Sequence, residues 1–298
     1  MTVLDVIIVG GGLSGLLVAR GLEKHQQYRL LEASARLGGR LLGEIDMGGA
    51  WLWPHHQPHT KQFIKDIGIE TFPQPDDPSS TRVRGGAVSM IHKLADRLDS
   101  QNVLLESPVT KCSLQEQNGE KLVRVQSGTN EYLARRVVLA VPPALIAKHI
   151  DFDPPLSKEK QQAMEKSHTW MAGVTKVALE YPDRFWDLKS SNTGLRGAPA
   201  FQVYDSGTTK IPALTFFTHV PPEKTAWLED DNKLAQAVAT QMAWMWKAVG
   251  LESQAERATS YTACRVQRWP HEPYISEERH PAQIHPHPYP IRALSESE

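Results

Sequence analysis

A strand, a glycine-rich turn and a helix at the start of the chain constrain the fold more than any other feature. Residues 4–9 (LDVIIV) form a short apolar, β-branched run, which is typical of a strand buried on both faces. The run leads into the turn GGGLSG at residues 10–15, and a helix at 16–23 and a second strand at 28–31 are predicted to follow. This order predicts an α/β fold built on a βαβ unit with a parallel sheet.

The residues of this turn are the types needed to bind a dinucleotide. Gly10 allows a tight turn, Gly12 lets the backbone approach a pyrophosphate, and Gly15 lets helix and strand pack closely. The helix N-terminus, where Ser14 lies, offers free N–H groups and the positive end of a dipole to phosphates. Glu32 ends the second strand twenty residues after Gly12, where its carboxylate can accept hydrogen bonds from ribose hydroxyls. The acid disfavours NADP, whose extra phosphate it would repel.

The following segment distinguishes FAD from NAD. Residues 32–40 (EASARLGGR) carry two glycines, which permit close backbone approach, and two arginines, Arg36 and Arg40, which supply charge for a pyrophosphate. A solvated turn with incidental arginines is the alternative. The segment, including Gly39, resembles the LEA…R.GGR signature of the flavin amine oxidase family. The resemblance implies FAD as the cofactor and a Rossmann-type FAD-binding domain.

Two further segments resemble parts of this family that contact FAD. Residues 46–51 (DMGGAW) are similar to the family's next motif, which implies that Gly49 and Ala50 lie close to the flavin ring and that Trp51 closes one side of it. Taken alone, Trp51 would be interpreted as a core aromatic. Residues 105–109 (LESPV) are similar to a strand whose last residue, Val109, contacts the adenine end through its backbone. An ordinary hydrophobic strand end is the alternative for Val109.

Lys176 is the candidate catalytic residue. It lies in residues 173–181 (GVTKVALEY), a mostly apolar and β-branched run that predicts a largely buried strand. A buried lysine is costly unless it has a partner, whereas a solvent-facing lysine on an edge strand is common. The segment resembles the family's strand whose lysine holds a water against N5 of the flavin. The resemblance therefore implies this role for Lys176.

The resemblance extends over most of the chain and implies two domains. Residues 1–150 are expected to form the Rossmann-type FAD-binding domain, to which residues 252–298 return, and residues 151–251 a second, α+β substrate domain. Residues 56–81 are a candidate extension of the substrate domain. Other elements are predicted as follows: a hairpin of 122–126 and 131–133, a return strand at 137–143, a helix at 89–98, and an amphipathic helix at 232–249.

Composition and charge exclude several classes of partner. The chain has 33 basic and 34 acidic residues and a formal net charge of −1, which gives no argument for nucleic acid binding. No apolar run reaches the roughly eighteen residues needed to span a bilayer, and two distant cysteines indicate a reducing compartment, so a soluble, cytoplasmic protein is predicted. No metal site is predicted, because the grouped histidines lie in proline-rich loops without carboxylate or cysteine partners: His55, His56, His59, His280, His285 and His287.

The end of the chain departs from the family in two ways. Residues 269–274 (WPHEPY) resemble the family's W..E.Y segment, and in some relatives a cysteine four residues after the tyrosine carries the flavin covalently. Glu278 occupies that position here, so non-covalent FAD is expected. The chain ends at Glu298, before the family's final segment that contacts the pyrophosphate and the flavin. We therefore expect weak retention of FAD.

The resemblance implies an oxidase of C–N bonds that acts on a small-molecule amine. In this family the substrate carbon passes a hydride to flavin N5, the imine hydrolyses, and oxygen reoxidises the flavin to give peroxide. Two alternatives remain open. An FAD-dependent desaturase or porphyrinogen-type oxidase, which acts on C–C bonds, would share the first fifty residues, and a non-catalytic truncated flavin-binding module would lack the final segment. Lys176 in its GVTKV context favours amine oxidation.

Overall fold

The computed structural model describes residues 2–74, 77–167, 169–188, 198–221 and 223–276. By its backbone packing the chain divides into two compact units: unit 1 comprises residues 1–40, 90–172 and 271–298, and unit 2 comprises residues 41–89 and 173–270. Residues 56–81, the candidate extension of the substrate domain, lie in unit 2. The functional domain limits expected from the sequence stay a prediction.

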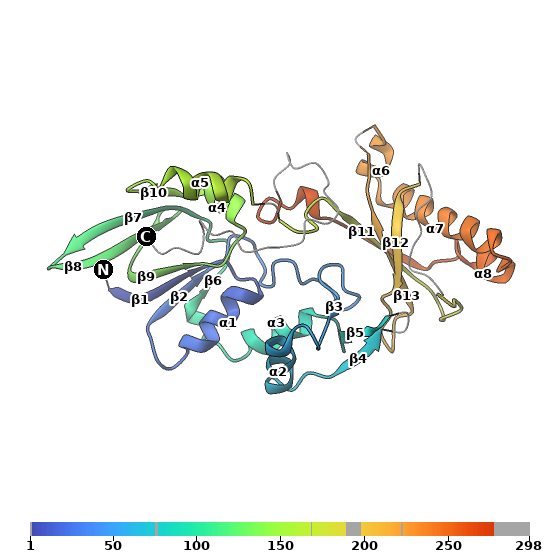
Figure 1. Ribbon diagram of the computed structural model, residues 1–298, viewed down its shortest axis with the longest axis horizontal. Helices are drawn as coiled ribbons and strands as arrows, with labels where there is room; N and C mark the ends of the chain where they lie inside the picture. Colours follow the sequence, from blue (N-terminus) through green and yellow to red (C-terminus); the bar gives the residue numbers. More distant parts are fainter. Residues whose placement is uncertain (1, 75–76, 168, 189–197, 222, 277–298) are drawn as a thin grey trace. The chain divides into compact units, whose positions relative to one another are not determined.

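Unit 1 is built on a seven-stranded mixed sheet with the strand order β10-β7-β8-β9-β1-β2-β6 (Figure 1). Its strands are β1 (Val3–Val9), β2 (Tyr28–Leu31), β6 (Val103–Leu104), β7 (Val109–Gln117), β8 (Glu120–Ser127), β9 (Asn130–Leu139) and β10 (Asp151–Asp153). Its helices are α1 (Leu13–Leu22), α4 (Pro143–His149), α5 (Lys158–Glu165) and the 3-10 turn η1 (Ser100–Asn102). Since β1 pairs in parallel with both β2 and β9, the predicted Rossmann-type α/β unit is confirmed.

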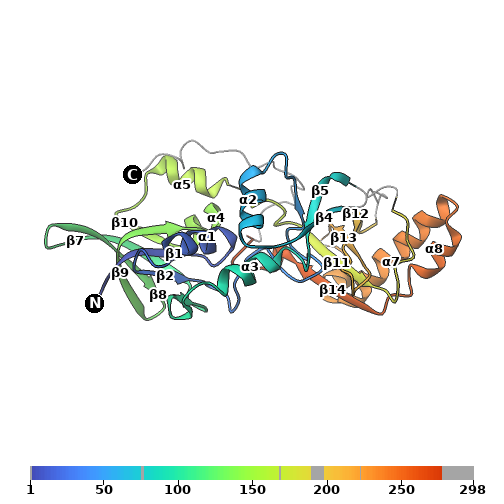
Figure 2. The ribbon, with the colours of Figure 1, turned by 90° about the horizontal axis from the view of Figure 1, so that it is seen from below.

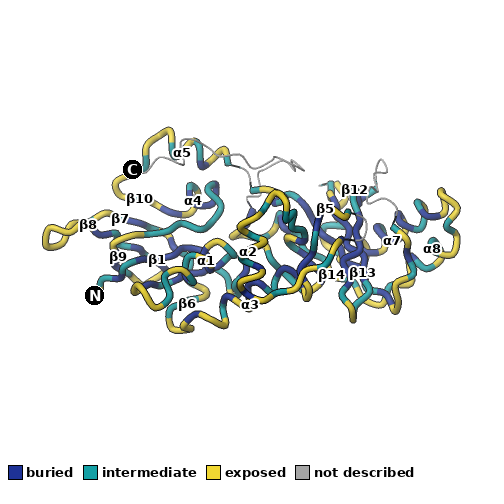
Figure 3. Tube along the Cα trace, turned by 60° about the horizontal axis from the view of Figure 1, so that its bottom comes forward, coloured by how far each residue is buried: buried dark blue, intermediate teal, exposed yellow. Residues whose placement is uncertain are grey.

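The apolar run of β1 follows from its central place in this sheet. Ile7 and Ile8 point to opposite faces and are both fully buried, as the dark tube of β1 in Figure 3 shows. A strand covered on both faces cannot alternate polar and apolar residues, because all the polar side chains would then be buried on one of the two faces. The chain then enters α1 through the glycine-rich turn at the carboxyl end of β1.

Two segments of unit 1 differ in detail from the sequence predictions. The expected strand at residues 105–109 is wrong: Val109 opens β7, because Glu106 adopts a left-handed φ of 52° and Pro108 has no N–H to donate. The predicted hairpin is confirmed by the antiparallel pairing of β8 and β9. The expected return strand is the continuation of β9, which turns from an antiparallel partner, β8, to a parallel partner, β1.

Unit 2 contains two antiparallel sheets, with the orders β12-β13-β11-β14 and β3-β5-β4. The larger sheet comprises β11 (Thr175–Glu180), β12 (Ala200–Asp205), β13 (Ala213–Thr218) and β14 (Ala263–Arg268), and the smaller comprises β3 (Trp51–Leu52), β4 (Thr71–Gln74) and β5 (Asp77–Val83). The helices are α2 (Pro58–Asp66), α6 (Thr225–Glu229), α7 (Asp231–Ala248) and α8 (Glu252–Arg257). The chain passes between the units at α3 (Val88–Ala95) and η2 (Trp269–His271). This is an α+β unit.

The four-stranded sheet of unit 2 has two different faces, because successive side chains of a strand point in opposite directions. Val177 and Phe216 lie on the face that packs against α7, through residues such as Leu234 and Val238 (Figure 2). The predicted amphipathic helix is thus confirmed as α7, whose apolar stripe covers this face. Lys176 precedes Val177 on β11 and therefore points to the opposite face, where the candidate active site lies.

Candidate cofactor and active sites

The turn between β1 and α1 is crowded at three of its glycines. Gly10 has a left-handed φ of +103°, and a Cβ atom on Gly15 would lie 1.9 Å from the Gly10 carbonyl oxygen. At Gly11 a Cβ atom would lie 2.5 Å from a methyl carbon of Leu37. A Cβ atom on Gly12, by contrast, would meet no heavy atom within 4 Å. Backbone atoms therefore require glycine at positions 10 and 15, and a Cβ atom at Gly11 would require the Leu37 side chain to shift. The open side of Gly12 fits the close approach of a ligand.

Glu32 lies beside this turn and its carboxylate is held by backbone and side-chain donors. Its Oε2 accepts a hydrogen bond of 2.5 Å from the Gly11 N–H, and its Oε1 accepts bonds of 2.8 and 2.7 Å from the N–H and Oγ of Ser34. A carboxylate can accept about four hydrogen bonds, so this one keeps acceptor capacity for a ribose hydroxyl. The internal bonds fix its orientation at the end of β2.

The segment after β2 carries an arginine nitrogen that has no partner in the protein. Among the described residues, Arg36 Nη1 is buried without a hydrogen bond, while Arg36 Nη2 donates to the Gly39 carbonyl at 2.9 Å. Arg40 is exposed, and its Nη1 donates to the Trp170 carbonyl at 3.0 Å. A buried guanidinium donor left without an acceptor is costly, and a phosphate oxygen would satisfy it. Helix α1 begins at Leu13, and its N-cap residue Gly12 has no side chain to cap it, so its first-turn N–H groups, beside the exposed Ser14, are also suited to a phosphate.

In unit 2, Lys176 is 3% exposed and its ammonium group is surrounded by partners. Its Nζ donates to the carbonyls of Asp46 and Gly48, at 2.9 and 2.6 Å, and to the hydroxyl of Tyr204 at 3.1 Å. It also lies 4.5 Å from the centre of the Phe217 ring, within the range of a cation–π interaction. The prediction that Lys176 is largely buried is confirmed. Because an ammonium has three donors, this one is fully engaged with the protein.

The turn at residues 46–48, whose carbonyls accept hydrogen bonds from Lys176, is also held by a buried ion pair between Asp46 and Arg82. The Asp46 carboxylate accepts hydrogen bonds from Arg82 Nη2 at 2.8 Å and Nε at 3.1 Å, and from the Ala87 N–H at 2.7 Å. Arg82 also donates to the carbonyls of Asp205 and Ser206, both at 2.8 Å. Both side chains of the ion pair are nearly inaccessible, at 2% and 1%. Every strong polar group of this pair therefore has a partner, as burial requires.

Burial and these neighbours shift the acid–base properties of the cluster. Burial lowers the pKa of Lys176 to about 7, while Asp46 raises it and Arg82 lowers it further. Burial raises the pKa of the Asp46 carboxyl, and the charge and hydrogen bonds of Arg82, the Ala87 N–H and Lys176 oppose that rise. Burial also raises the pKa of Tyr204, so its hydroxyl is neutral and can donate. With a pKa of about 7, Lys176 can exchange a proton near neutral pH.

The remaining residues predicted to contact FAD lie partly in unit 2 and partly in unit 1. Gly49, Ala50 and Trp51 follow directly after the turn that Lys176 holds, and all belong to unit 2. Ala50 is buried, and the Trp51 ring stacks on Phe217 with centroids 5.7 Å apart. Val109 is buried at the start of β7 in unit 1. Their contacts with FAD stay a prediction, and Glu278 lies outside the described residues, as do His280, His285 and His287.

Four residues of these clusters were not assigned a role from the sequence. Gly11 occupies a variable position of the glycine pattern, yet a Cβ atom there would lie 2.5 Å from a methyl carbon of Leu37, whose side chain would have to shift. Asp46 was noted only as part of a motif. Arg82 lies at a buried position of β5, where buried and less buried residues alternate from Ser80 to Arg82. A charged residue at such a position was a usable sequence signal that a buried partner must exist. Nothing local marks Tyr204, because its role depends on Lys176, 28 residues away.

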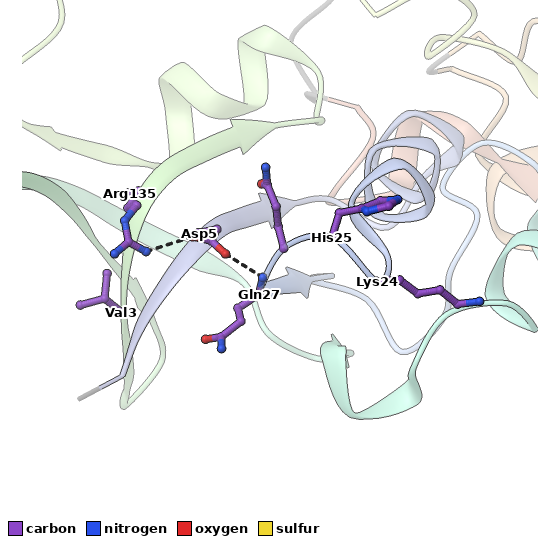
Figure 4. A pocket seen from close by; sticks show the side chains of 7 residues that line it. Val3, Asp5, Lys24, His25, Gln27 and Arg135 are labelled. Atoms are coloured by element: carbon purple, nitrogen blue, oxygen red, sulfur yellow. Dashed lines mark hydrogen bonds and ion pairs between the residues drawn. The ribbon is translucent and has the colours of Figure 1, made fainter.

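A hollow on unit 1 lies at the other end of β1 from the glycine turn. It is lined by the start of β1, by Arg135 in the middle of β9 and by the loop after α1, and Figure 4 shows its polar side chains. Asp5 accepts hydrogen bonds from Arg135 at 2.9 Å and from the Gln27 N–H at 2.8 Å, so the central carboxylate is already paired. Ligands of open α/β sheets bind at the carboxyl ends of the strands, and this hollow lies at the amino ends. It contains none of the predicted site residues.

The described residues contain no group of three or more histidine, cysteine, aspartate or glutamate side chains arranged to bind a metal ion. Within the same residues, no helix combines the length and apolar character that a membrane crossing requires.

Comparison with known proteins assigns the chain to a family. Residues 76–296 match the family model of flavin-containing amine oxidoreductases, and residues 8–67 match that of NAD(P)-binding Rossmann-like domains. The chain belongs to the flavin-containing amine oxidoreductase family. This confirms the family resemblance and the oxidoreductase class. FAD is accordingly the cofactor, and the open side of Gly12, the unpartnered Arg36 Nη1 and the Glu32 carboxylate fit its ADP part.

Curated relatives match parts of the chain. It is 31% identical over 212 residues to lysine-specific histone demethylase 2 of Homo sapiens, covering 65% of the chain and 23% of that protein. It is 43% identical over 81 residues to L-amino acid dehydrogenase of Synechocystis sp., covering 24% of the chain and 17% of that protein. The chain thus spans about a quarter or less of the length of these relatives.

Solved structures show the same fold. Wild-type putrescine oxidase bound to putrescine superposes with a TM-score of 0.74 at 18% identity, covering 92% of this chain and 86% of that one. Cyclohexylamine oxidase from Brevibacterium oxydans superposes with a TM-score of 0.72, also at 18% identity, covering 92% and 86% of the two chains. At this identity the likeness concerns the fold alone.

Proposed function

We propose that this chain serves FAD-dependent oxidation of the C–N bond of a small amine, with oxygen as electron acceptor. The observation that carries the proposal is the buried ammonium of Lys176, held at the turn that leads into Gly49, Ala50 and Trp51. Family membership supports the redox class, and the relatives named as amine oxidases, such as amine oxidase A of Equus caballus, support the amine. Which amine is oxidised is outside this proposal.

The residues of unit 1 bind and orient the cofactor. Glu32 accepts from the adenosine ribose, and Arg36 Nη1, Arg40 and the first-turn N–H groups of α1 neutralise the pyrophosphate. Val109 contacts the adenine end through its backbone. Because Glu278 cannot form the thioether that a cysteine forms, FAD is held without a covalent bond.

In its protonated form, Lys176 supplies a positive charge where negative charge develops during the redox reaction. When bound, FAD supplies the two-electron chemistry: it takes electrons from the amine and passes them to oxygen. Lys176 holds a water for this chemistry by releasing one of its three acceptors, since a protonated lysine has no fourth donor. With a pKa of about 7, it can also exchange a proton with a substrate amine that must be neutral to react.

The test is stopped-flow reoxidation of the dithionite-reduced protein by oxygen, which needs no knowledge of the substrate. Lys176→Met removes the charge and keeps the apolar stem, and we expect reoxidation to slow about 10²-fold. Lys247→Met, which removes an exposed lysine of α7, is the control and should reoxidise like the wild type. Equal reoxidation rates for Lys176→Met and the wild type, at equal FAD content, would show that Lys176 has no role in reoxidation and serves only the structure.

Product analysis distinguishes the proposal from its alternatives. Amine oxidation gives peroxide together with an aldehyde or ketone and the released amine or ammonia, whereas oxidation of a C–C bond gives peroxide without a carbonyl product. A non-catalytic flavin-binding module would show the flavin absorbance maxima near about 370 and 450 nm, a property of the cofactor, without bleaching by any amine.

A further inference from the structure

Tyr204 lies on the same face of the four-stranded sheet as Lys176. Lys176 on β11 is paired across the sheet with Phe217 on β13, and Tyr204 on β12 is paired with Thr215 of the same strand, two residues from Phe217. Residues two apart on a strand share a face, so the three side chains converge on one side of the sheet. Tyr204 is 1% exposed.

The hydroxyl of Tyr204 joins Lys176 to the turn at residues 46–48. It accepts a hydrogen bond from Lys176 Nζ at 3.1 Å and donates one to the Asp46 carbonyl at 2.9 Å. The Asp46 carbonyl also accepts directly from Lys176 at 2.9 Å, so the three groups form a closed triangle. Two of the three acceptors of Lys176 are backbone carbonyls, and the third is the side-chain hydroxyl of Tyr204. The hydrogen bond to Tyr204 is the longest of the three.

The triangle makes one of the three bonds of Lys176 easier to release than the others. If Lys176 turned away from Asp46, the carbonyl would stay paired with the Tyr204 hydroxyl, so no buried polar group would be orphaned. The Gly48 carbonyl has no such second donor among the described residues. A buried carbonyl without a donor is costly, so the bond to Gly48 is the one that Lys176 keeps.

We propose that Tyr204 is the positioning residue of Lys176: its hydroxyl orients the ammonium and takes over the Asp46 carbonyl when Lys176 donates to another acceptor. This proposal rests on the proposed function of Lys176 and assigns Tyr204 a role that acts only through the lysine. The ring of Tyr204, 5.2 Å from Nζ, and the ring of Phe217 line the path of that movement. The charged groups that face Lys176 are Asp46 and Arg82, and both are fixed by their ion pair.

The first test measures the pKa of Lys176 in the full chain by NMR of ¹³Cε-labelled lysine, assigned with Lys176→Met. Tyr204→Phe keeps the ring and removes the hydroxyl, so the ammonium loses an acceptor and its pKa should fall by about half to one unit. Tyr181→Phe is the matched control, because Tyr181 is also buried in unit 2 and donates to a carbonyl, that of Ala258, at 2.8 Å. It should leave the pKa of Lys176 unchanged.

A measurement on the wild-type chain keeps the proposal testable even if Tyr204→Phe does not fold. The ¹³Cζ resonance of Tyr204 should move with pH at the same midpoint as Lys176, because the hydroxyl senses whether the lysine is charged. An unchanged Lys176 pKa in Tyr204→Phe, an equal fall in Tyr181→Phe, or a Tyr204 resonance indifferent to the lysine would each overturn the proposal.

The second test asks whether Tyr204 acts through Lys176 in flavin reoxidation. Tyr204→Phe should slow reoxidation of the FAD-loaded protein about threefold to tenfold at unchanged FAD content. In a Lys176→Met background the same change should have no further effect, as expected for two residues that act as one unit. Additive losses would overturn the positioning role. If Lys176→Met reoxidises normally while Tyr204→Phe still shifts the lysine pKa, the proposed function of Lys176 fails and the contact survives.

Discussion

The glycine turn of unit 1 and the lysine cluster of unit 2 are built by different physical means. In the turn, Gly10 and Gly15 are required because neighbouring backbone atoms leave no room for Cβ atoms. In the cluster, Asp46, Arg82 and Lys176 are required because each buried charge must find partners. The first is a problem of space and the second a problem of electrostatics.

The two regions also differ in how far along the chain their parts lie. The groups that crowd Gly11 and Gly15 come from residues 8–37, and Gly10 also meets Ala140 and Val141 at the end of β9. Lys176 and the Asp46 carbonyl are 130 residues apart. Errors in the turn should therefore have mainly local consequences, and errors in the cluster should loosen several strands of unit 2 together. The following predictions test this difference, beginning with the largest expected effect.

Removing the cation of the buried ion pair should cost most. Arg82→Met leaves the Asp46 carboxylate buried without its partner, and we expect a loss of about 3–5 kcal/mol in the free energy of unfolding, measured with urea. Arg84→Met is the matched control, because Arg84 pairs with Glu70 at the same 2.8 Å but on the surface, and should cost less than about 1 kcal/mol. Similar losses for the two variants would show that burial does not set the value of this pair.

Steric overlap in the turn should come next. Gly15→Ala brings a Cβ atom against the Gly10 carbonyl, and we expect the free energy of unfolding of the chain to fall by about 3 kcal/mol, with loss of bound FAD. Gly21→Ala, in the same helix but with no heavy atom within 4 Å of its Cβ position, should instead stabilise the chain by up to about 1 kcal/mol. Thermal unfolding of both variants checks the contrast, which would disappear if the turn could open without cost.

The carboxylate beside the turn should affect binding more than folding. Glu32→Ala should weaken FAD affinity by about 1.5–3 kcal/mol, the value of a hydrogen bond to a charged group. Ser34→Ala removes one internal donor to Glu32 while keeping the carboxylate, and should have a smaller effect. Equilibrium dialysis measures both affinities. Unchanged affinity in Glu32→Ala would remove the ribose contact from the proposal.

The pH dependence of stability should report the burial of Lys176. Its pKa is about 7 in the folded chain and 10.5 ordinarily, so between these values the unfolded chain binds one more proton and stability rises with pH. Relative to Lys176→Met, the wild type should gain about 1.5 kcal/mol in the free energy of unfolding from pH 7 to pH 8.5. Lys247→Met, at an exposed position, should show no such difference from wild type. A flat difference for Lys176→Met would mean that the lysine keeps its ordinary pKa.

The order of residues along the chain determined the parts of this protein whose physics is local. The apolar run of β1, the glycines of the turn and Glu32 at the end of β2 lie within about thirty residues, so their spacing predicted the βαβ unit and a dinucleotide site. FAD and the family were predicted from the resemblance of residues 32–40. The apolar, β-branched neighbours of Lys176 likewise predicted a largely buried strand, with a solvent-facing lysine on an edge strand as the alternative, and Lys176 is buried.

Tertiary structure decided which partners the buried groups meet. Nothing near Lys176 in the sequence indicates that its acceptors are two carbonyls of the turn at residues 46–48 and the hydroxyl of Tyr204, or that Arg82 fixes that turn through Asp46. Strand limits were decided in the same way, since β9 continues through the expected return strand once β1 provides it with a second partner. The reason is that a hydrogen bond or an ion pair is fixed by distance in space, and only the packing of β5, β11 and β12 brings these distant residues within about 3 Å of one another.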